Sequence, residues 1–209
     1  MKKKFGISLG LLTLFVLWTV AVSLVDVQAI GPQGSSVGFA KINQFVHNLT
    51  GVNFTLYTVT DWLGLVPVGV GAGFGILGLV QWIQRKKLCK VDCSILVLGG
   101  FYIVTIGVYL LFEYLVINYR PVLINGYLEA SYPSSTTMLV MCVMPTAMMQ
   151  CNSRIKNKML KKIVAVVITV FMAFMVIGRL LSGVHWVSDI IGGLLLSAGL
   201  VMLYHTFEL

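Results

Sequence analysis

The sequence predicts an all-α, polytopic membrane protein built as a bundle of six transmembrane helices. Two observations carry this prediction. Hydrophobic residues make up 58% of the 209-residue chain and charged residues only 11%, whereas a soluble domain has about 25% charged residues. Long apolar stretches also recur along the chain, and a helix needs roughly 20 such residues to cross a bilayer. The composition therefore excludes a water-soluble enzyme, and it excludes a disordered chain because disorder requires low hydrophobicity.

Six stretches are apolar enough to be interpreted as spans, of which the fourth is the shortest. The first follows three lysines, and its apolar run is longer than the roughly 7–15 residues of a signal-peptide core, so we expect a retained anchor. A cleaved signal peptide is the alternative, since Val27–Ala29 faintly resembles a cleavage site. The predicted spans are Phe5–Val25, Trp62–Trp82, Ser94–Val116, Ser135–Gln150, Ile163–Leu181 and His185–Tyr204.

We expect residues 1–209 to form a single membrane domain. Residues 1–30 are the N-terminal anchor helix, residues 31–60 an outer-face loop, and residues 61–209 a five-helix core. Apolar residues at helical spacing within Ser35–Leu49 predict a short helix that lies on the outer membrane surface.

The charged residues orient the bundle. Fifteen basic residues against seven acidic ones give a net charge of +8. Most of the basic residues fall in three clusters that six spans place on one side of the membrane, and basic loops mark the cytoplasmic side. Both termini are therefore expected in the cytoplasm, and the charge indicates topology rather than a nucleic-acid partner. The clusters are Lys2, Lys3 and Lys4; Arg85, Lys86, Lys87 and Lys90; and Arg154, Lys156, Lys158, Lys161 and Lys162.

The four cysteines lie near the cytoplasmic side or in the lower membrane, where reducing conditions disfavour structural disulfides. Cys89 and Cys93 lack a second pair of ligands nearby, and a structural zinc site needs four. We therefore predict no metal site.

Three basic residues lie on the outer side instead: Lys41, Arg120 and Arg179. The two arginines are at the outer ends of helices, and a guanidinium group is well suited to binding phosphate oxygens. A single arginine at such a place is explained equally well by snorkelling to lipid headgroups. Two of them at one boundary indicate an anion site.

A run of hydroxyl residues lies at the same boundary. Ser134, Ser135 and Thr136 follow Pro133 at the start of the fourth span, where free backbone N–H groups and the helix dipole favour an anion. Taken alone, the run would only cap the helix. Beside the arginines, we predict that these three residues bind phosphate.

His185 and Asp189 supply a candidate nucleophile. They are four residues apart, so on a helix they share a face. The carboxylate could then hold one imidazole nitrogen and raise the nucleophilicity of the other. An interfacial hydrogen-bonded pair is the alternative, but ionisable residues at membrane depth are functional candidates by default. The sequence thus predicts an anion pocket with a histidine nucleophile that opens to the outer leaflet.

These residues resemble the type 2 phosphatidic acid phosphatase (PAP2) superfamily of membrane lipid phosphatases, whose third motif is SRxxxxxHxxxD. Here Gly178 and Arg179 are followed after five residues by His185, and after three more by Asp189. Only the leading serine of that motif differs. The resemblance covers Asp61–Leu209 and includes the order of the motifs along the chain.

The first two family motifs, KxxxxxxRP and PSGH, are less well kept. Arg120 and Pro121 end the first motif, but Glu113 stands at the lysine position. In the second motif, Ser135 replaces glycine and Thr136 replaces histidine. Glu113 removes a positive charge from the phosphate pocket, unless it pairs with one of the two arginines.

The resemblance implies a two-step phosphoryl transfer at the extracytoplasmic side of the cell membrane. The histidine matching His185 attacks phosphorus and forms a phosphohistidine, which water hydrolyses. Asp189 would orient His185, while Arg120, Arg179 and Ser134 would hold the phosphoryl oxygens. The implied partner is a lipid phosphate in the membrane, with no metal and no organic cofactor.

Thr136 leaves two functional hypotheses open, because a hydroxyl group cannot replace the family histidine as the acid that protonates the leaving oxygen. Loss of a positioned acid lowers the rate by about 10²–10⁴. The first hypothesis is an active membrane phosphatase that hydrolyses a lipid phosphate or an isoprenyl diphosphate; the monophosphate leaving group of a diphosphate needs little protonation. The second is a catalytically impaired relative that binds lipid phosphates without hydrolysing them.

Overall fold

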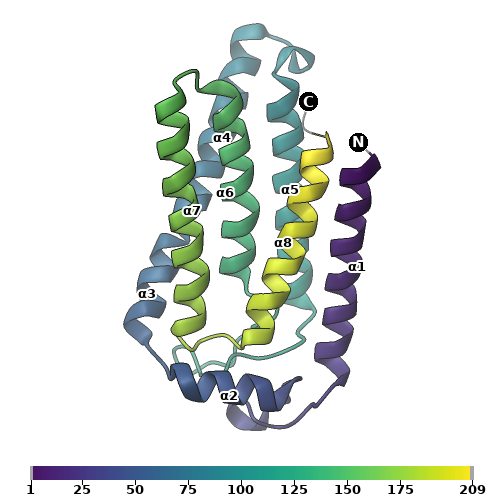
Figure 1. The fold of residues 1–209 in the computed structure, drawn as a ribbon, viewed down its shortest axis with the longest axis vertical. Helices are drawn as coiled ribbons and strands as arrows, with labels where there is room; N and C mark the ends of the chain where they lie inside the picture. The colour runs from purple at the N-terminus through teal and green to yellow at the C-terminus, as the bar shows by residue number, and fades with distance from the viewer. Residues whose placement is uncertain (1, 208–209) are drawn as a thin grey trace.

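Helices form wherever the sequence is apolar for about 20 residues, and they assemble into an elongated bundle (Figure 1). The computed structural model describes residues 2–207, and within these it contains helices and isolated bridges but no strand. The all-α membrane fold is thereby confirmed. The elements are α1 (Lys2–Leu24), η1 (Pro32–Gly34), α2 (Ala40–Thr50), α3 (Phe54–Leu63), α4 (Leu65–Arg85), η2 (Leu88–Lys90), α5 (Cys93–Tyr114), α6 (Ser135–Arg154), α7 (Lys158–Leu181) and α8 (Val187–Phe207).

Five stretches within residues 2–207 are long and apolar enough to cross a membrane. The apolar side chains of the first four stretches are largely exposed in the isolated chain, as expected of lipid-facing residues, whereas the stretch that forms α8 is mostly buried. The five stretches are Lys2–Leu24, Phe54–Arg85, Cys93–Tyr114, Lys158–Leu181 and Val187–Phe207.

Helix α6 is not among these five, although it runs through the middle of the bundle (Figure 1). It packs against α4, α5, α7 and α8. Two of its polar side chains are buried and bonded inside the protein: Gln150 Nε2 donates to the Tyr204 hydroxyl at 2.6 Å, and Thr146 Oγ1 donates to the carbonyl of Cys142 at 2.9 Å. A helix enclosed by protein needs no uniformly apolar surface, which explains its weak signal. The count of six spans stays a prediction.

The predicted second span begins earlier than Trp62. Helix α3 starts at Phe54, where the side chain of Asn53 caps it by accepting from the backbone N–H of Leu56 at 2.9 Å. The chain bends at Gly64 and continues as α4. The extra turns bring Tyr57, Thr60 and Asp61 to the end of the bundle at which the candidate site lies.

The short helix expected within Ser35–Leu49 forms as α2, which lies across one end of the bundle (Figure 1). Its apolar residues Ile42, Phe45 and Leu49 are exposed. Asn43 is fully buried: its Nδ2 donates to Ser188 Oγ at 2.9 Å, and its Oδ1 accepts from the backbone N–H of Ser188 at 3.1 Å. Helix α2 is thereby fixed to the first turn of α8.

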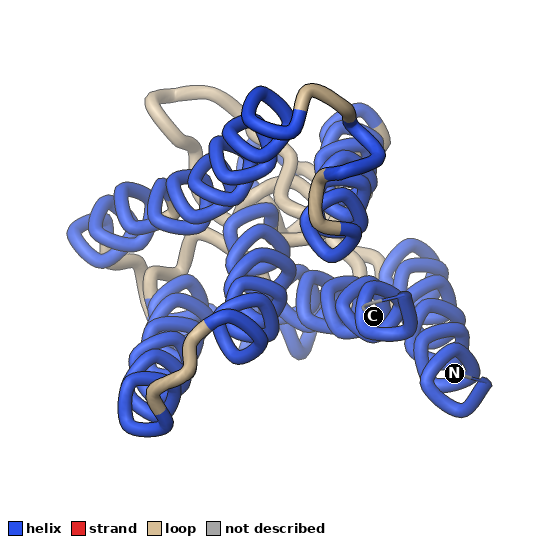
Figure 2. Tube along the Cα trace, turned by 90° about the horizontal axis from the view of Figure 1, so that it is seen from above, coloured by secondary structure: helices blue, strands red, loops and turns tan. Residues whose placement is uncertain are grey.

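Helices α1 and α8 pack side by side, and the start of α1 lies near the end of α8 when the bundle is seen from above (Figure 2). The contact depends on a glycine, because a Cβ at Gly199 would lie 2.7 Å from Cδ2 of Leu12. Close approach over small residues is a common way in which membrane helices associate.

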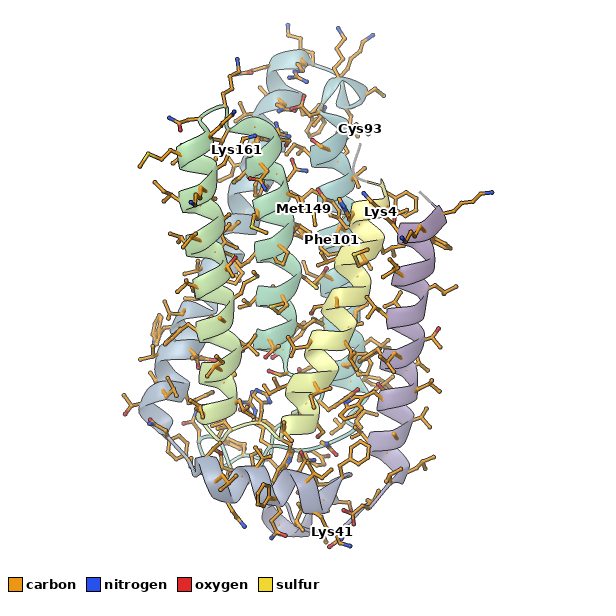
Figure 3. The ribbon with its side chains drawn as sticks, in the orientation of Figure 1. Lys4, Lys41, Cys93, Phe101, Met149 and Lys161 are labelled. Atoms are coloured by element: carbon orange, nitrogen blue, oxygen red, sulfur yellow. The ribbon has the colours of Figure 1, made fainter. Side chains whose placement is uncertain are left out.

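The two ends of the bundle differ in charge. Lys4, Lys161 and the start of α5 lie at one end, and Lys41 lies at the other (Figure 3). At the basic end, Asp92 links the loop after α4 to the end of α6. Its carboxylate accepts hydrogen bonds from Gln81 Nε2 at 2.8 Å and from Arg154 Nη1 at 3.1 Å. The hydrogen bonds from Gln81, Arg85 and Arg154 lower the pKa of Asp92 to about 2.

Candidate active site

Two loops build the site at the end of the bundle that α2 crosses. The first is a hairpin over residues 118–131, which turns at Asn125 and Gly126, both at positive φ. An Asn-Gly pair in this conformation is typical of a two-residue hairpin turn. Across the hairpin, the N–H of Arg120 donates to the carbonyl of Glu129 at 3.0 Å, and the N–H of Ser131 donates to the carbonyl of Asn118 at 2.9 Å.

The second loop joins α7 to α8 and carries His185. The chain turns at Gly183, where φ is +66° and a Cβ would lie 1.8 Å from the carbonyl oxygen of Gly51. Helix α8 begins only at Val187, so His185 precedes it, and the prediction that His185 and Asp189 share a helical face is wrong. Asp189 instead caps the helix: its Oδ2 accepts from the backbone N–H of Trp186 at 3.0 Å, as in a capping box.

Ser131 and Asn118, which sequence reasoning missed, connect these two loops. Asp189 is fully buried, and its Oδ2 lies 4.0 Å from Nδ1 of His185, too far for a hydrogen bond. Ser131 Oγ fills the gap, since it lies 3.0 Å from Nδ1 of His185 and donates a short hydrogen bond to Asp189 Oδ2. Asn118 Nδ2 donates to the other carboxylate oxygen at 3.2 Å. The Asn125-Gly126 turn was the signal that could have indicated this hairpin.

His185 is the buried centre of the site, with only 2% of its surface exposed. Burial holds the pKa of His185 well below its usual range, and the nearby charges of Arg120 and Arg179 act in the same direction. The imidazole is therefore neutral at pH 7. Its Nε2 lies 3.5 Å from Nη2 of Arg179, so the nitrogen that Ser131 does not occupy faces a guanidinium group.

The two predicted phosphate-binding arginines come together over one aromatic ring. The guanidinium carbons of Arg179 and Arg120 lie 5.0 Å and 5.9 Å from the ring centroid of Tyr57. Arg179 is 1% exposed and contacts Asp61 at 3.7 Å and Thr60 Oγ1 at 3.4 Å. Within residues 2–207, Arg120 Nη1 and Arg179 Nε are buried without a hydrogen-bond partner. Buried donors are normally satisfied, so these two donors are available to an anion.

The hydroxyl run 134–136 does not converge on one point. Ser134 is buried and its Oγ has no partner in the described chain, but its backbone N–H donates to the carbonyl of Asp189 at 3.0 Å. The contact between α6 and α8 therefore already uses the backbone donor of Ser134, so its hydroxyl is the group left to contact an anion. Ser135 and Thr136 line the same apolar cavity, and Ser135 also lines the polar one.

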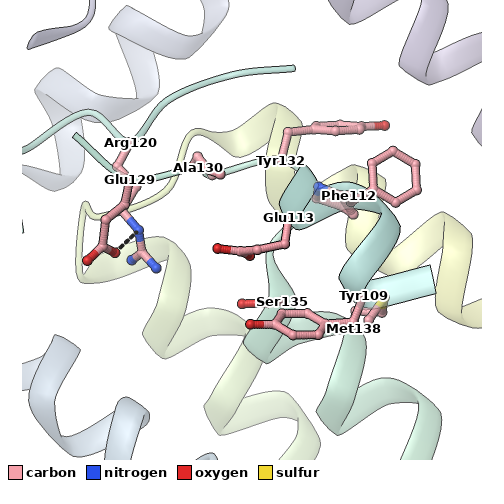
Figure 4. A pocket seen from close by; sticks show the side chains of 11 residues that line it. Tyr109, Phe112, Glu113, Arg120, Glu129, Ala130, Tyr132, Ser135 and Met138 are labelled. Atoms are coloured by element: carbon pink, nitrogen blue, oxygen red, sulfur yellow. Dashed lines mark ion pairs between the residues drawn. The ribbon is translucent and has the colours of Figure 1, made fainter. Parts of the chain in front are cut away.

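The acidic residues pair differently from the prediction. Arg120 Nε lies 3.1 Å from Oε2 of Glu129, its neighbour across the hairpin, and Arg179 pairs with Asp61. The pairing of Glu113 with either arginine is not found among the ion pairs of residues 2–207. Figure 4 shows the Arg120–Glu129 pair on one wall of a cavity, with Glu113, Ser135 and Tyr109 on the other.

That cavity has a volume of about 310 Å³ and a mostly polar lining, which includes Arg120 and Ser131. Tyr109, Ser135 and Met138 also line an adjoining apolar cavity of about 330 Å³ beside Thr136 and Asp61. A third cavity, of about 390 Å³, continues it between α4 and α5. His185 lines none of these cavities, but it contacts Ser131, which does.

Together these residues place a neutral, buried imidazole beside two guanidinium groups with free donors. Such an arrangement can hold the oxygens of a phosphoryl group and offer a nitrogen nucleophile to its phosphorus. In the described part of the chain, no group of three or more His, Cys, Asp or Glu side chains could hold a metal ion.

Comparison with known proteins agrees with this chemistry. The family model of the PAP2 superfamily matches residues 94–208, which is more than half of the chain and includes all the motif positions. No curated protein matches significantly. Among solved structures, the chain is similar to a transmembrane PAP2-type phosphatidylglycerolphosphate phosphatase from Bacillus subtilis, with a TM-score of 0.57, 20% identity, and coverage of 96% of this chain and 95% of the other. At this identity, the likeness shows a common fold.

Proposed function

Because the chain belongs to the PAP2 superfamily, we propose that it is a membrane lipid phosphatase that hydrolyses a lipid phosphate or an isoprenyl diphosphate through a phosphohistidine. The observation that carries the proposal is the position of His185. Its Nε2 lies 3.5 Å from Arg179, beside two guanidinium groups that have buried, unpartnered donors. A site that only binds phosphate needs the arginines but has no use for a neutral histidine linked through Ser131 to a buried carboxylate.

The reaction follows from these positions in two steps. His185 Nε2 attacks phosphorus while the P–O bond to the lipid breaks, and Arg120 and Arg179 stabilise the charge on the non-bridging oxygens. Electrostatic stabilisation of this kind provides most of the rate enhancement in phosphoryl transfer. Water then attacks the phosphohistidine, the N–P bond breaks, and inorganic phosphate leaves while His185 returns to its neutral form.

The nature of the leaving group decides how much Thr136 matters. A lipid phosphate monoester expels an alkoxide, which needs a proton that Thr136 cannot supply. An isoprenyl diphosphate attacked at its terminal phosphorus expels a lipid monophosphate, which is stable without protonation. We therefore expect diphosphates to be the better substrates. Phosphate release by the purified protein in detergent, with phosphatidate and an isoprenyl diphosphate compared side by side, tests the proposal.

Thr136 also supports the second candidate, a relative that binds lipid phosphates without hydrolysing them. Glu113 in the polar cavity favours the same candidate, because a carboxylate there repels phosphate. Saturable binding of both lipids with no phosphate release would establish this candidate and overturn the phosphatase.

Restoring the missing acid gives a direct prediction. Thr136→His is expected to raise turnover of phosphatidate by up to about 10²-fold, since a positioned acid contributes about 10²–10⁴. Turnover of an isoprenyl diphosphate should change little, because its leaving group needs no proton. Initial rates on both substrates check this, and an equal increase on both would contradict the assigned role of position 136.

The apolar cavities support a lipid substrate. They continue from the polar cavity along the space between α4 and α5, where Gly71 lines one of them together with Tyr102. A headgroup held at the arginines would extend its hydrocarbon chain into this space.

Filling this space gives a second prediction. A Cβ at Gly71 would lie 3.6 Å from the Tyr102 ring, so a phenylalanine side chain at this position must occupy the apolar cavity between α4 and α5. We expect Gly71→Phe to raise the KM for long-chain lipids about 10-fold, as expected from the loss of about two buried CH₂ groups. The KM for a short-chain, water-soluble phosphate ester should not change. Gly69→Phe on the same helix is the matched control, because Gly69 is exposed with nothing within 4 Å. Equal effects of both changes on the KM for long-chain lipids would contradict the proposal that the apolar cavity holds the hydrocarbon chain.

We also propose that both termini are cytoplasmic and that the site faces the extracytoplasmic side. The positive-inside rule supports this orientation. The basic clusters lie at the end of the bundle where α1 begins and α8 ends, and the site lies at the other end (Figures 1 and 3).

A further inference from the structure

Ser131 occupies a position between the proposed nucleophile and its carboxylate. In a direct His–Asp pair, the carboxylate oxygen accepts the imidazole N–H at hydrogen-bond distance, but here Nδ1 of His185 and Oδ2 of Asp189 are 4.0 Å apart. Ser131 Oγ contacts both groups. All three side chains are at least 97% buried, so water does not compete for these contacts.

The bonding capacity of each group determines the direction of the hydrogen bonds. Asp189 Oδ2 also accepts from the backbone N–H of Trp186, and a carboxylate can only accept, so the Ser131 hydroxyl proton is donated to Asp189. Ser131 Oγ then has only lone pairs to offer to His185. Nδ1 must therefore carry the imidazole proton, and the lone pair of the neutral ring is on Nε2, the nitrogen that faces Arg179.

From this geometry we propose that Ser131 is a positioning residue, which links His185 to Asp189 in a His–Ser–Asp relay and holds the imidazole with Nε2 free to attack phosphorus. The assignment rests on the proposed function. When Nε2 bonds to phosphorus, the ring becomes cationic while Nδ1 keeps its proton. Ser131 Oγ accepts a stronger hydrogen bond from that cation, and Asp189 stabilises the charge through the serine hydroxyl.

The surroundings of Asp189 support a relay held in one geometry. Asn118 donates to its Oδ1 at 3.2 Å, and Ser188 Oγ donates to the same oxygen at 3.3 Å. Asn118 and Ser131 are themselves paired across the hairpin through the backbone. The hairpin therefore sets the positions of both Ser131 and the amide that orients the carboxylate.

The test compares Ser131→Ala with Ser131→Thr, which keeps the hydroxyl, and with Ser197→Ala as a matched control. Ser197 is equally buried and loses its hydrogen bonds to the carbonyls of Met138 and Gly193, but neither bond involves His185, Ser131 or Asp189. We expect Ser131→Ala to lower kcat about 10²-fold, the effect of a misplaced reacting group, with KM unchanged. Ser131→Thr should restore most of kcat, and Ser197→Ala should match the wild type. Wild-type kcat in Ser131→Ala, or an equal loss in Ser131→Thr, would overturn the relay.

A second readout does not depend on turnover. The ¹⁵N NMR spectrum of His185, assigned by its loss in His185→Ala, reports which ring nitrogen carries the proton. We expect Nδ1–H in the wild type and a mixture of both tautomers in Ser131→Ala. If this tautomer pattern is found but the wild type releases no phosphate, the proposed function is wrong and the relay still holds. An unchanged tautomer in Ser131→Ala would remove the relay.

Discussion

Replacing His185 by alanine is expected to lower phosphate release by at least about 10⁴-fold, since removing a nucleophile leaves only the catalysis that binding and electrostatics provide. The loss should appear in kcat for every substrate, because no other side chain described in the site presents a nitrogen beside both arginines. Phosphate release in detergent, from proteins of matched thermal stability, measures the effect.

His205→Ala is the control for the His185 experiment, because His205 lies at the far end of the bundle, where it contacts Lys4. It should keep wild-type activity. Brief reaction with a ³²P-labelled lipid phosphate should also leave an acid-labile, base-stable label on the wild type and none on His185→Ala. Equal release by the wild type and His185→Ala would end the catalytic assignment of His185.

Replacing Arg179 by lysine is expected to lower kcat/KM by about 10²–10³, the usual effect of removing one donor to a developing oxyanion. Arg179 contacts His185 through Nη2, and it contacts both Thr60 and Asp61 through Nη1 of the same planar group. Lysine keeps the charge but has one compact ammonium group in place of the planar guanidinium with its several N–H donors. It therefore cannot make these contacts and also hold a phosphoryl oxygen.

Arg154→Lys is the matched control for this change. Arg154 also makes several contacts through different nitrogens, to Asp92, Ser94 and Gln150, but at the opposite end of the bundle. Its replacement should reduce thermal stability and leave kcat/KM unchanged. Full kcat/KM in Arg179→Lys would show that the charge of Arg179 alone is sufficient and that its geometry has no role.

The sequence also predicted where the chemistry is concentrated. In a chain with 11% charged residues, arginines outside the basic clusters are conspicuous, and Arg120 and Arg179 do lie together over Tyr57. His185 and Asp189 were identified through their four-residue spacing. Their mutual geometry was not predictable in the same way, because it depends on where α8 begins. The turn at Gly183 delays that start to Val187 and so leaves room for Ser131.

The hairpin shows why the remaining site residues were missed. Its Asn125-Gly126 turn is readable from sequence, but the pairing next to the turn joins Ile124 to Tyr127, whereas farther along Arg120 pairs with Glu129. This shift of two residues changes which side chains face each other. A register extended from the turn would therefore have placed Ser131 opposite the wrong residue.

Hydropathy and charge act locally along the chain, so they were enough to predict the membrane class and the helical architecture. The enclosure of α6, the pairing of Arg120 with Glu129 rather than Glu113, and the position of Ser131 between His185 and Asp189 became visible only in the folded chain. These features depend on contacts between segments far apart in the chain. Distances of a few ångströms decide such contacts, and they follow from how the helices and loops pack.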